Sequence, residues 1–149
     1  MRTVIKLISS CFFLGYFPFM SGTIASLAGV GLYLLIKDFH PIYLATSLII
    51  IILGFLTCGK AEDIFGKKDS RKIVIDELAG MLIALYLLPF RLSYLIAAFI
   101  IFRILDILKP YPLRRIENLK GSYGVMLDDI GAAVYTNIIM QIIVRYFIK

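Results

Sequence analysis

Five of the ten acidic residues in this sequence lie where apolar segments begin or end. They are Asp76, Glu77, Asp106, Asp128 and Asp129. Mg²⁺ commonly binds one or two carboxylates together with water and phosphate oxygens. If the fold brings these acids together, they would suit a site for Mg²⁺ and a phosphate group. For either adjacent pair alone, helix capping is an equally good explanation, because acidic side chains complement the dipole at a helix N-terminus.

Two basic residues flank Asp106 at helical spacing. Arg103, Asp106 and Lys109 follow one another at intervals of three, so they share roughly one face of a helix. Arg103 lies inside an apolar run, where an ionisable side chain points to function. A structural ion pair between Arg103 and Asp106 is the alternative. Lys109 stands just before Pro110, where the helix must end, and is a candidate phosphate contact.

A small-residue turn supplies a further candidate for anion binding. Gly22 and Thr23, with Ser26, begin an apolar helix. The first turn of a helix offers free N–H groups and a positive dipole to a phosphate. Thr23 could instead serve only as the N-cap of that helix.

The amino-acid composition indicates the kind of fold that must position these residues. Of 149 residues, 60% are apolar and 17% are charged, and the mean hydropathy is +0.91. Because a soluble domain of this size needs a polar surface, a disordered chain, a coiled coil and an ordinary soluble enzyme are disfavoured. We predict an all-α fold: a polytopic membrane bundle of four to five short helices plus an N-terminal amphipathic segment, forming one domain over residues 1–149. A compact soluble helical bundle is the structural alternative.

The predicted elements follow the alternation of apolar and polar segments. They are an amphipathic segment over 1–17, a turn over 18–27, a helix to about residue 36, a break over 37–40, a span over 41–58, a polar loop over 59–75, helices over 76–90 and 92–108, a polar loop over 113–127, and a last helix over 128–147. Cys11 and Cys58 lie in apolar surroundings without metal-binding spacing, which predicts buried thiols rather than a disulfide.

The net charge of +6 is concentrated in two loops. The 59–75 and 109–127 segments hold most of the internal basic residues, whereas the breaks near residues 38 and 91 hold one each. The positive-inside rule therefore predicts that both loops face the cytoplasm. This topology brings all five acids and the turn at 18–26 to the same membrane face. In so apolar a chain, lipid and phosphate are more plausible partners for the basic surplus than nucleic acid.

Missing residues narrow the chemistry. The single histidine, His40, lies in a break on the opposite side, so a phosphatase with a histidine nucleophile and a second histidine is excluded. Neither cysteine has an arginine six positions later, and no Asp-x-Asp motif is present. Attack by water assisted by a metal ion is the mechanism that remains.

Four ordered blocks resemble the phosphatidylglycerophosphatase A family. They are Pro18-x-x-x-Gly22-Thr23-x-x-Ser26-Leu27, Asp76-Glu77-x-x-Gly80, Phe102-Arg103-x-x-Asp106-x-x-Lys109-Pro110-x-Pro112, and Gly121-x-x-Gly124-x-x-x-Asp128-Asp129. Glu62 and Asp69 also fall where the family tends to carry acids. The blocks span about residues 15–133. The chain has Ser21 and Ala25 at two positions where the family usually has Pro and Gly.

The resemblance implies a Mg²⁺-dependent membrane phosphatase of phospholipid biosynthesis that converts phosphatidylglycerophosphate to phosphatidylglycerol and phosphate. Combining it with the residues, we expect Asp76 or Glu77, with Asp128 and Asp129, to hold Mg²⁺. Asp106 would orient water or act as a base. The phosphate charge would be offset by Lys109, Arg103 and the turn at Gly22, Thr23 and Ser26.

The expected partners are the lipid substrate and the bilayer, without nucleic acid, and the expected location is the bacterial cytoplasmic (inner) membrane with the site facing the cytoplasm. Two alternatives stay open. One is a phosphatase or phosphotransferase for another lipid phosphomonoester. The other is a non-catalytic membrane scaffold or transport subunit, in which the acids would be caps and ion-pair partners.

Overall fold

The computed structural model describes residues 1–147, and within this range every regular element is helical. The elements are α1 (Arg2–Ser9), the short 3₁₀ helix η1 (Leu14–Tyr16), α2 (Ser21–Ile36), α3 (His40–Phe65), α4 (Ile75–Leu85), α5 (Leu92–Leu108), α6 (Leu113–Ile116) and α7 (Ser122–Phe147). The all-α prediction is therefore confirmed. So is the division into five main helices and an N-terminal helical segment, although α3 and α7, at 26 residues each, are longer than expected.

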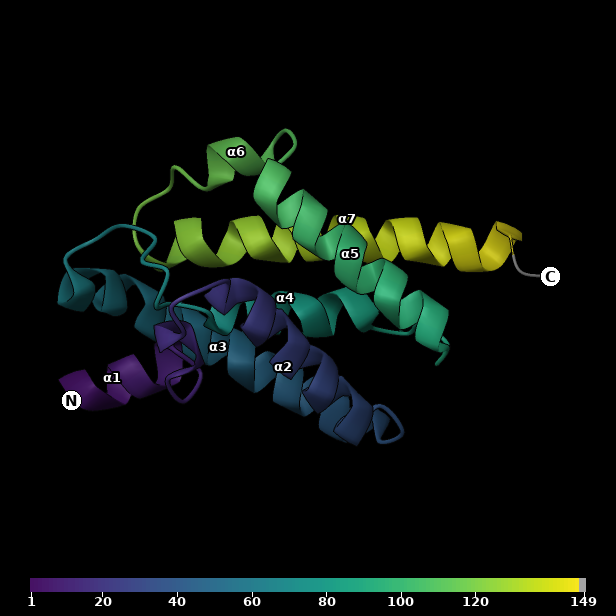
Figure 1. Cartoon of the computed structure of the whole chain (residues 1–149), viewed down its shortest axis with the longest axis horizontal. Helices are drawn as coiled ribbons and strands as arrows, with labels where there is room; N and C mark the ends of the chain where they lie inside the picture. The colour runs from purple at the N-terminus through teal and green to yellow at the C-terminus, as the bar shows by residue number, and fades with distance from the viewer. Residues whose placement is uncertain (148–149) are drawn as a thin grey trace.

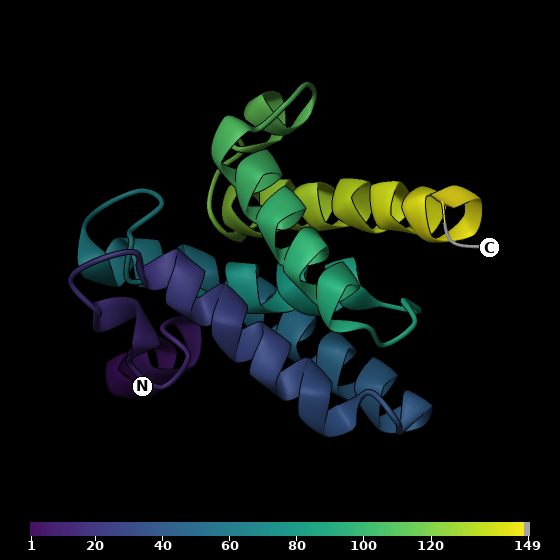
Figure 2. The ribbon, with the colours of Figure 1, turned by 45° about the vertical axis from the view of Figure 1, so that its right-hand side comes forward.

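Helix α4 lies at the centre of the fold. It runs beside α7 and packs against α2, α3 and α5 as well (Figure 1). After a turn of 45°, α2 and α5 are still seen to cross α4 on one side of the molecule (Figure 2). The sequence of α4 explains this position, because an apolar helix with buried residues on all sides belongs in a core. Ala79, Met81, Leu82 and Leu85 are all almost completely buried.

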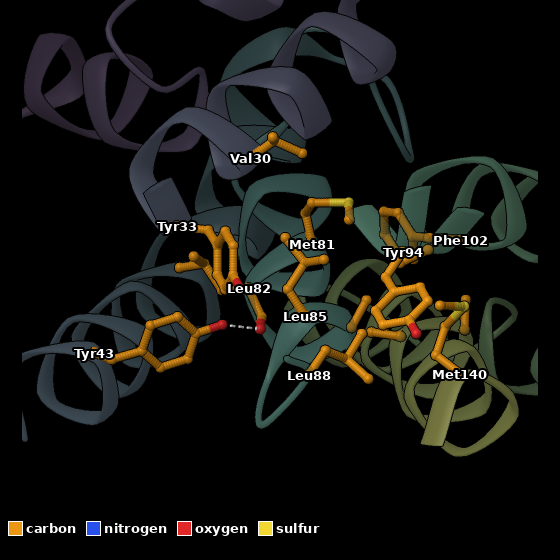
Figure 3. Close-up of a cluster of buried hydrophobic side chains, with 14 of the residues drawn as sticks. Val30, Tyr33, Tyr43, Met81, Leu82, Leu85, Leu88, Tyr94, Phe102 and Met140 are labelled. Atoms are coloured by element: carbon orange, nitrogen blue, oxygen red, sulfur yellow. Dashed lines mark hydrogen bonds between the residues drawn. The ribbon is translucent and has the colours of Figure 1, made fainter. Parts of the chain in front are cut away.

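The main core surrounds this central helix. Side chains from α2, α3, α5 and α7 converge on Met81, Leu82 and Leu85 (Figure 3). The hydroxyl of Tyr43 donates a hydrogen bond to the backbone carbonyl of Leu82, which fixes α3 against α4. A buried tyrosine needs such a partner, because an unpaired hydroxyl in the core is costly.

Two helices are long and apolar enough to cross a membrane, judged by length and composition alone: His40–Phe65 and Ser122–Tyr146. Large apolar side chains such as Leu44, Leu48 and Ile52 are exposed along α3. Helix α4 has 11 residues, which gives a length of ~17 Å, well short of the ~30 Å hydrocarbon core. Helix α4 is therefore not a candidate span, whereas Asp128 and Asp129 lie within the candidate span Ser122–Tyr146.

Several element boundaries were predicted wrongly. Helix α2 begins at Ser21, inside the expected turn over 18–27. Two further differences concern polar segments. Helix α3 continues to Phe65, so part of the expected 59–75 loop is helical, and Gly66 ends that helix at a φ of 66°. Helix α7 begins at Ser122, so Asp128 and Asp129 lie past its first turn instead of opening it. The physical reason is the same in both cases. The polar residues of these segments lie on well-formed helices, and a run of polar residues does not by itself indicate a loop.

The end of α4 is set by another helix. The side-chain amide of Asn137 on α7 donates to the carbonyls of Ala84 (3.1 Å) and Tyr86 (2.7 Å). Gln141, one turn later, donates to the Tyr86 carbonyl at 3.4 Å. These bonds satisfy carbonyl groups that a helix end leaves open. As a result α4 ends at Leu85, before the expected residue 90.

A smaller cluster supports the N-terminal segment. Ile5 and Ile8 of α1 pack against buried residues that include Cys58, Ala61 and Ile73. The predicted thiols are confirmed as free: Cys58 is buried and Cys11 is half-buried. Burial raises the pKa of the Cys11 thiol to about 12, so this thiol is unreactive near neutral pH.

Candidate active site

Three acids from two helices meet in the interior of the fold. Asp76 and Glu77 lie in the first turn of α4, and Asp129 reaches them from α7. One carboxylate oxygen from each lies within 4.8 Å of the others. Asp76 and Asp129 are 6% and 3% exposed. Of the five acids predicted to gather, three therefore lie together, whereas Asp106 and Asp128 are outside this group.

These three carboxylates fit a metal ion. Each has one buried oxygen without a hydrogen-bond partner among the described residues: Asp76 Oδ1, Glu77 Oε2 and Asp129 Oδ2. Leaving several buried anionic oxygens unpaired is strongly unfavourable unless a cation compensates them. Among the described residues no side-chain hydrogen bond caps the N-terminus of α4, and the two acids in its first turn also complement the helix dipole. The donor set, all oxygen, is of the type that hard divalent cations prefer.

Burial alters the ionisation of the acids on α4. Desolvation, and then the charge of Glu77, raise the pKa of Asp76 well above its ordinary value. Desolvation also raises the pKa of Glu77 to about 7, although its hydrogen bond with Asp76 acts in the opposite direction. Both shifts express the cost of placing several negative charges together away from water. A divalent cation among them would favour the ionised forms.

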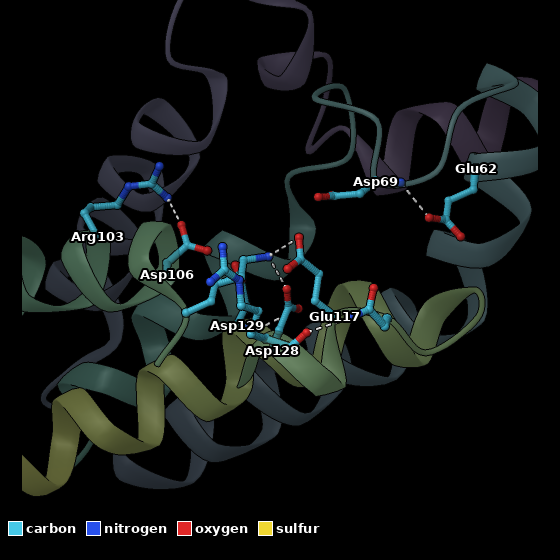
Figure 4. A network of polar contacts seen from close by, with 10 residues as sticks. Glu62, Asp69, Arg103, Asp106, Glu117, Asp128 and Asp129 are labelled. Atoms are coloured by element: carbon cyan, nitrogen blue, oxygen red, sulfur yellow. Dashed lines mark hydrogen bonds and ion pairs between the residues drawn. The ribbon is translucent and has the colours of Figure 1, made fainter. Parts of the chain in front are cut away.

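Asp128 lies apart from this cluster. Its carboxylate forms an ion pair with Nζ of Lys109, which is also 3.2 Å from Oε1 of Glu117 (Figure 4). Adjacent residues on a helix point about 100° apart, which explains why Asp128 and Asp129 have different partners. Burial alone would lower the pKa of Lys109, but its bond to Asp128 holds that pKa above the ordinary value. The role of Asp128 as a metal ligand stays a prediction, and the structure gives its carboxylate a different contact.

Arg103 and Asp106 form the ion pair that their spacing allows. Nη1 of Arg103 donates to Oδ2 of Asp106 at 2.7 Å, and both side chains are largely buried (Figure 4). The Nε of Arg103 is buried without a partner. This arginine therefore retains hydrogen-bonding capacity beyond its pairing with Asp106.

The N-terminus of α2 lies directly against the site. A Cβ added to Gly22 would overlap Oε1 of Glu77 and lie 3.2 Å from Nη1 of Arg103. Thus only a residue without a side chain allows α2 to approach both groups. Ser26 is buried, and its hydroxyl donates to the Gly22 carbonyl at 2.9 Å. Thr23 is not the N-cap, since that position is Met20.

A cavity of about 590 Å³ connects this region with the surface. Glu77, Arg103 and Gly22 line it together with the loop before α2 and the segment 69–73, whereas Asp76, Asp106 and Asp129 do not. Thr23, Ser26 and Lys109 do not line it. Arg71 and Lys72 do line it, and the sequence reasoning missed them, as it missed Glu117. The only sequence feature that marks Arg71 and Lys72 is their position in a basic loop. The positive-inside rule explains the charge of that loop equally well.

Replacing Lys109 by Met is expected to lower the free energy of unfolding by about 3–5 kcal/mol, because the buried Asp128 carboxylate loses its ion-pair partner. Asp128 is 4% exposed, so water cannot replace the lost partner. The double variant Lys109→Met/Asp128→Asn should recover much of this loss. Denaturation in detergent of the two single variants and the double variant would measure the coupling. Additive losses would contradict a buried ion pair.

Comparison with known proteins assigns the family. The model of the phosphatidylglycerophosphatase A family matches residues 7–144. Proteins named phosphatidylglycerophosphatase A from Haemophilus influenzae and Escherichia coli are each 38% identical over 80% of this chain, which covers 76% and 72% of their lengths. A Bacteroides thetaiotaomicron protein provisionally named a phosphatidylinositol-3-phosphatase is 37% identical over 91% of both chains. No solved structure matches. With nearly the whole sequence matched, the chain belongs to the phosphatidylglycerophosphatase A family.

Proposed function

We propose that this protein is a Mg²⁺-dependent membrane phosphatase that hydrolyses phosphatidylglycerophosphate to phosphatidylglycerol and phosphate in phospholipid biosynthesis. The observation that carries this proposal is the group of three buried carboxylates with unpartnered oxygens, next to Arg103 and a cavity. The names of the Haemophilus influenzae and Escherichia coli relatives support the choice of substrate.

The residues of the site divide into proposed metal ligands and proposed phosphate contacts. Asp76, Glu77 and Asp129 would hold Mg²⁺ through the oxygens that have no hydrogen-bond partner in the described part of the chain. When bound, this ion supplies polarisation of the phosphomonoester and makes water more acidic. Asp128 would hold Lys109 in place, and the use of Lys109 as a phosphate contact stays a prediction. The backbone of Gly22 would present the positive end of α2 to the phosphate.

The remaining steps concern protons and charge. Water would attack phosphorus and lose a proton to Asp106, which its bond to Arg103 keeps in a fixed orientation. The guanidinium of Arg103, at the cavity wall, would offset the charge that develops on the phosphate oxygens. The phosphorus–oxygen bond to the glycerol would break, and the released glycerol oxygen would take up the proton that Asp106 accepted. The products are a neutral hydroxyl on phosphatidylglycerol and inorganic phosphate.

We also propose that the domain is integral to the bacterial inner membrane, with the site at the cytoplasmic face. Helices α3 and α7 have the length and composition of spans, and exposed apolar residues such as Leu48, Ile100 and Ile138 lie on α3, α5 and α7. In water such a surface would be unusual for a monomer, whereas lipid would cover it. The basic loops support the orientation.

A phosphatase for another lipid phosphomonoester is the second candidate. The Bacteroides thetaiotaomicron relative, which matches 91% of the chain, carries the name of a phosphatidylinositol-3-phosphatase. The same acids and Arg103 would serve that reaction. The two candidates differ in the group that the cavity must accommodate beyond the phosphate.

Phosphate release from carbonate-washed membranes tests the proposal. Membranes containing the protein are expected to release phosphate from phosphatidylglycerophosphate faster than from phosphatidylinositol 3-phosphate. Chelation should abolish release and added Mg²⁺ should restore it. Loss of the protein in the wash would contradict the membrane assignment. Faster hydrolysis of the inositol lipid would favour the second candidate, and no Mg²⁺-dependent release from either would favour a non-catalytic scaffold.

A further inference from the structure

The cavity beside the acids has two cationic side chains that the proposed chemistry does not use. Arg71 and Lys72 line it together with Arg103 and Glu77. Both are exposed, and neither forms an ion pair with any carboxylate of residues 1–147. Of the three acids, Glu77 lines the cavity, and with Arg103 it forms the side at which the phosphomonoester would react. Asp69 lines the same wall, and the two cations leave the wall with a net positive charge. A net positive wall suits a second anionic group on the ligand.

The backbone of this wall is fixed from two sides. The hydroxyl of Ser21, at the start of α2, donates to the carbonyl of Arg71 at 2.7 Å. A Cβ on the buried Gly15 would overlap the carbonyl oxygen of Lys72, so the loop before α2 rests directly on that peptide. The N–H of Val74 donates to the carbonyl of Ser9 at 2.9 Å. The two cations therefore extend from an anchored backbone, although they lie in a segment without regular secondary structure.

The Lys72 side chain is held by aromatic rings. Its Nζ lies 5.0 Å from the ring centre of Tyr16 and 5.4 Å from that of Phe65. Cation–π contacts of this kind orient an ammonium group but leave its charge uncompensated. An anion entering the cavity would find a positioned cation that is not already paired. Next to Tyr16, the exposed Phe17 and Met20 give the outer cavity an apolar edge, as expected where a lipid leaves the bilayer.

We infer that Arg71 and Lys72 bind the phosphodiester of the lipid while the acids and Arg103 act on its terminal phosphomonoester. This inference rests on the proposed function and adds a second contact to it: the substrate is held at its phosphodiester to diacylglycerol as well as at the reacting phosphomonoester. The volume of about 590 Å³ lies within the usual range for ligand pockets and suits a headgroup of this size. A lipid whose only phosphate is the monoester would leave the two cations without a partner.

Comparison of two lipids that share a terminal phosphomonoester, of which one also carries a phosphodiester and a second glycerol, tests the inference. Purified full-length protein in detergent would be assayed on short-chain phosphatidylglycerophosphate and on phosphatidic acid with the same acyl chains. For Arg71→Gln/Lys72→Gln, KM for phosphatidylglycerophosphate is expected to rise at least about tenfold, the size of a lost charge-assisted contact, with kcat within about twofold. The kcat/KM for phosphatidic acid should stay within about twofold. An equal loss on both lipids, or none on phosphatidylglycerophosphate, would overturn the inference.

The matched control is Lys67→Gln/Lys68→Gln. It removes the same charge from the same basic loop, but neither residue lines this cavity. Both kinetic constants should stay at wild-type values. A control that changes the ratio between the two lipids as strongly would mean that overall surface charge, and not this wall, controls selectivity.

A binding measurement separates this inference from the proposed reaction. Short-chain phosphatidylglycerol carries the diester and no monoester, so its affinity for the protein can be measured without turnover. The Arg71→Gln/Lys72→Gln variant should bind it about tenfold more weakly than the wild type. If the wild type hydrolyses no phosphatidylglycerophosphate but the affinity difference is observed, the proposed function fails and the anion site stands. Equal affinities would overturn the site even in an active enzyme.

Discussion

Replacing Asp129 by Asn is expected to lower phosphate release by about 10³-fold or more while the protein remains folded, which is the scale of losing a metal ion that polarises the phosphate. Asp129 is the one member of the three-acid cluster that comes from α7, and its Oδ2 is buried without a partner. The amide keeps the shape of the side chain but removes its charge. The measurement is kcat on phosphatidylglycerophosphate at saturating Mg²⁺.

The same variant should lose activity but, when Mg²⁺ is absent, should not lose stability. Neutralising one of three clustered buried carboxylates relieves repulsion, so its melting temperature without Mg²⁺ should equal or exceed that of the wild type. The rise in melting temperature that Mg²⁺ gives the wild type should be lost, since that rise reports binding to the folded state. Asp63→Asn, at an exposed acid of α3, is the control and should change neither property. An active, folded Asp129→Asn protein would remove this residue from the site.

Gly22→Ala is expected to reduce kcat by about 10²-fold, because displacements near 1 Å at a reacting centre have effects of this size. The added Cβ would overlap Oε1 of Glu77 and crowd Nη1 of Arg103. Both atoms are at the ends of flexible side chains, so the fold can accommodate the methyl group by moving them. The variant should therefore melt within a few degrees of the wild type while it loses activity.

Gly31→Ala provides the control on the same helix. A Cβ at that position meets nothing within 4 Å. Because alanine has the higher helix propensity, this variant should keep full activity and gain up to about 1 kcal/mol of stability. If Gly22→Ala is as active as Gly31→Ala, Glu77 and Arg103 do not need their observed positions.

The sequence predicted the kind of fold and most of its helices correctly, because helical apolar runs and prolines are local signals. The predicted boundaries were wrong where a polar segment is helical. Asp128 and Asp129 looked like the opening of a helix because polar residues precede them, whereas α7 begins at Ser122. The end of α4 at Leu85 depends on Asn137, more than fifty residues away, and no local pattern reports such a bond.

The sequence indicated which residue types form the site better than it indicated which residues contact one another. Loop charge and span order correctly indicated that distant acids would meet, and Asp76, Glu77 and Asp129 do. The partner of each acid was not predictable from spacing alone. Asp128 pairs with Lys109 because successive helical residues point in different directions, and which of the two faces the cluster depends on the rotation of α7 about its axis.

The bonds from Asn137 and Gln141 to the end of α4 have a consequence for how lipid selectivity can change. They fix the axial register of α4 on α7 at the end remote from the acids, so the two helices that bear Asp76, Glu77 and Asp129 cannot slide past one another. The walls that would recognise the headgroup belong instead to the loop before α2 and to residues 69–73. On the proposed function, substitutions in those walls would change the choice of headgroup while the three acids keep their spacing. One scaffold can therefore serve different lipid phosphates, consistent with relatives of similar identity that bear the names of two such enzymes.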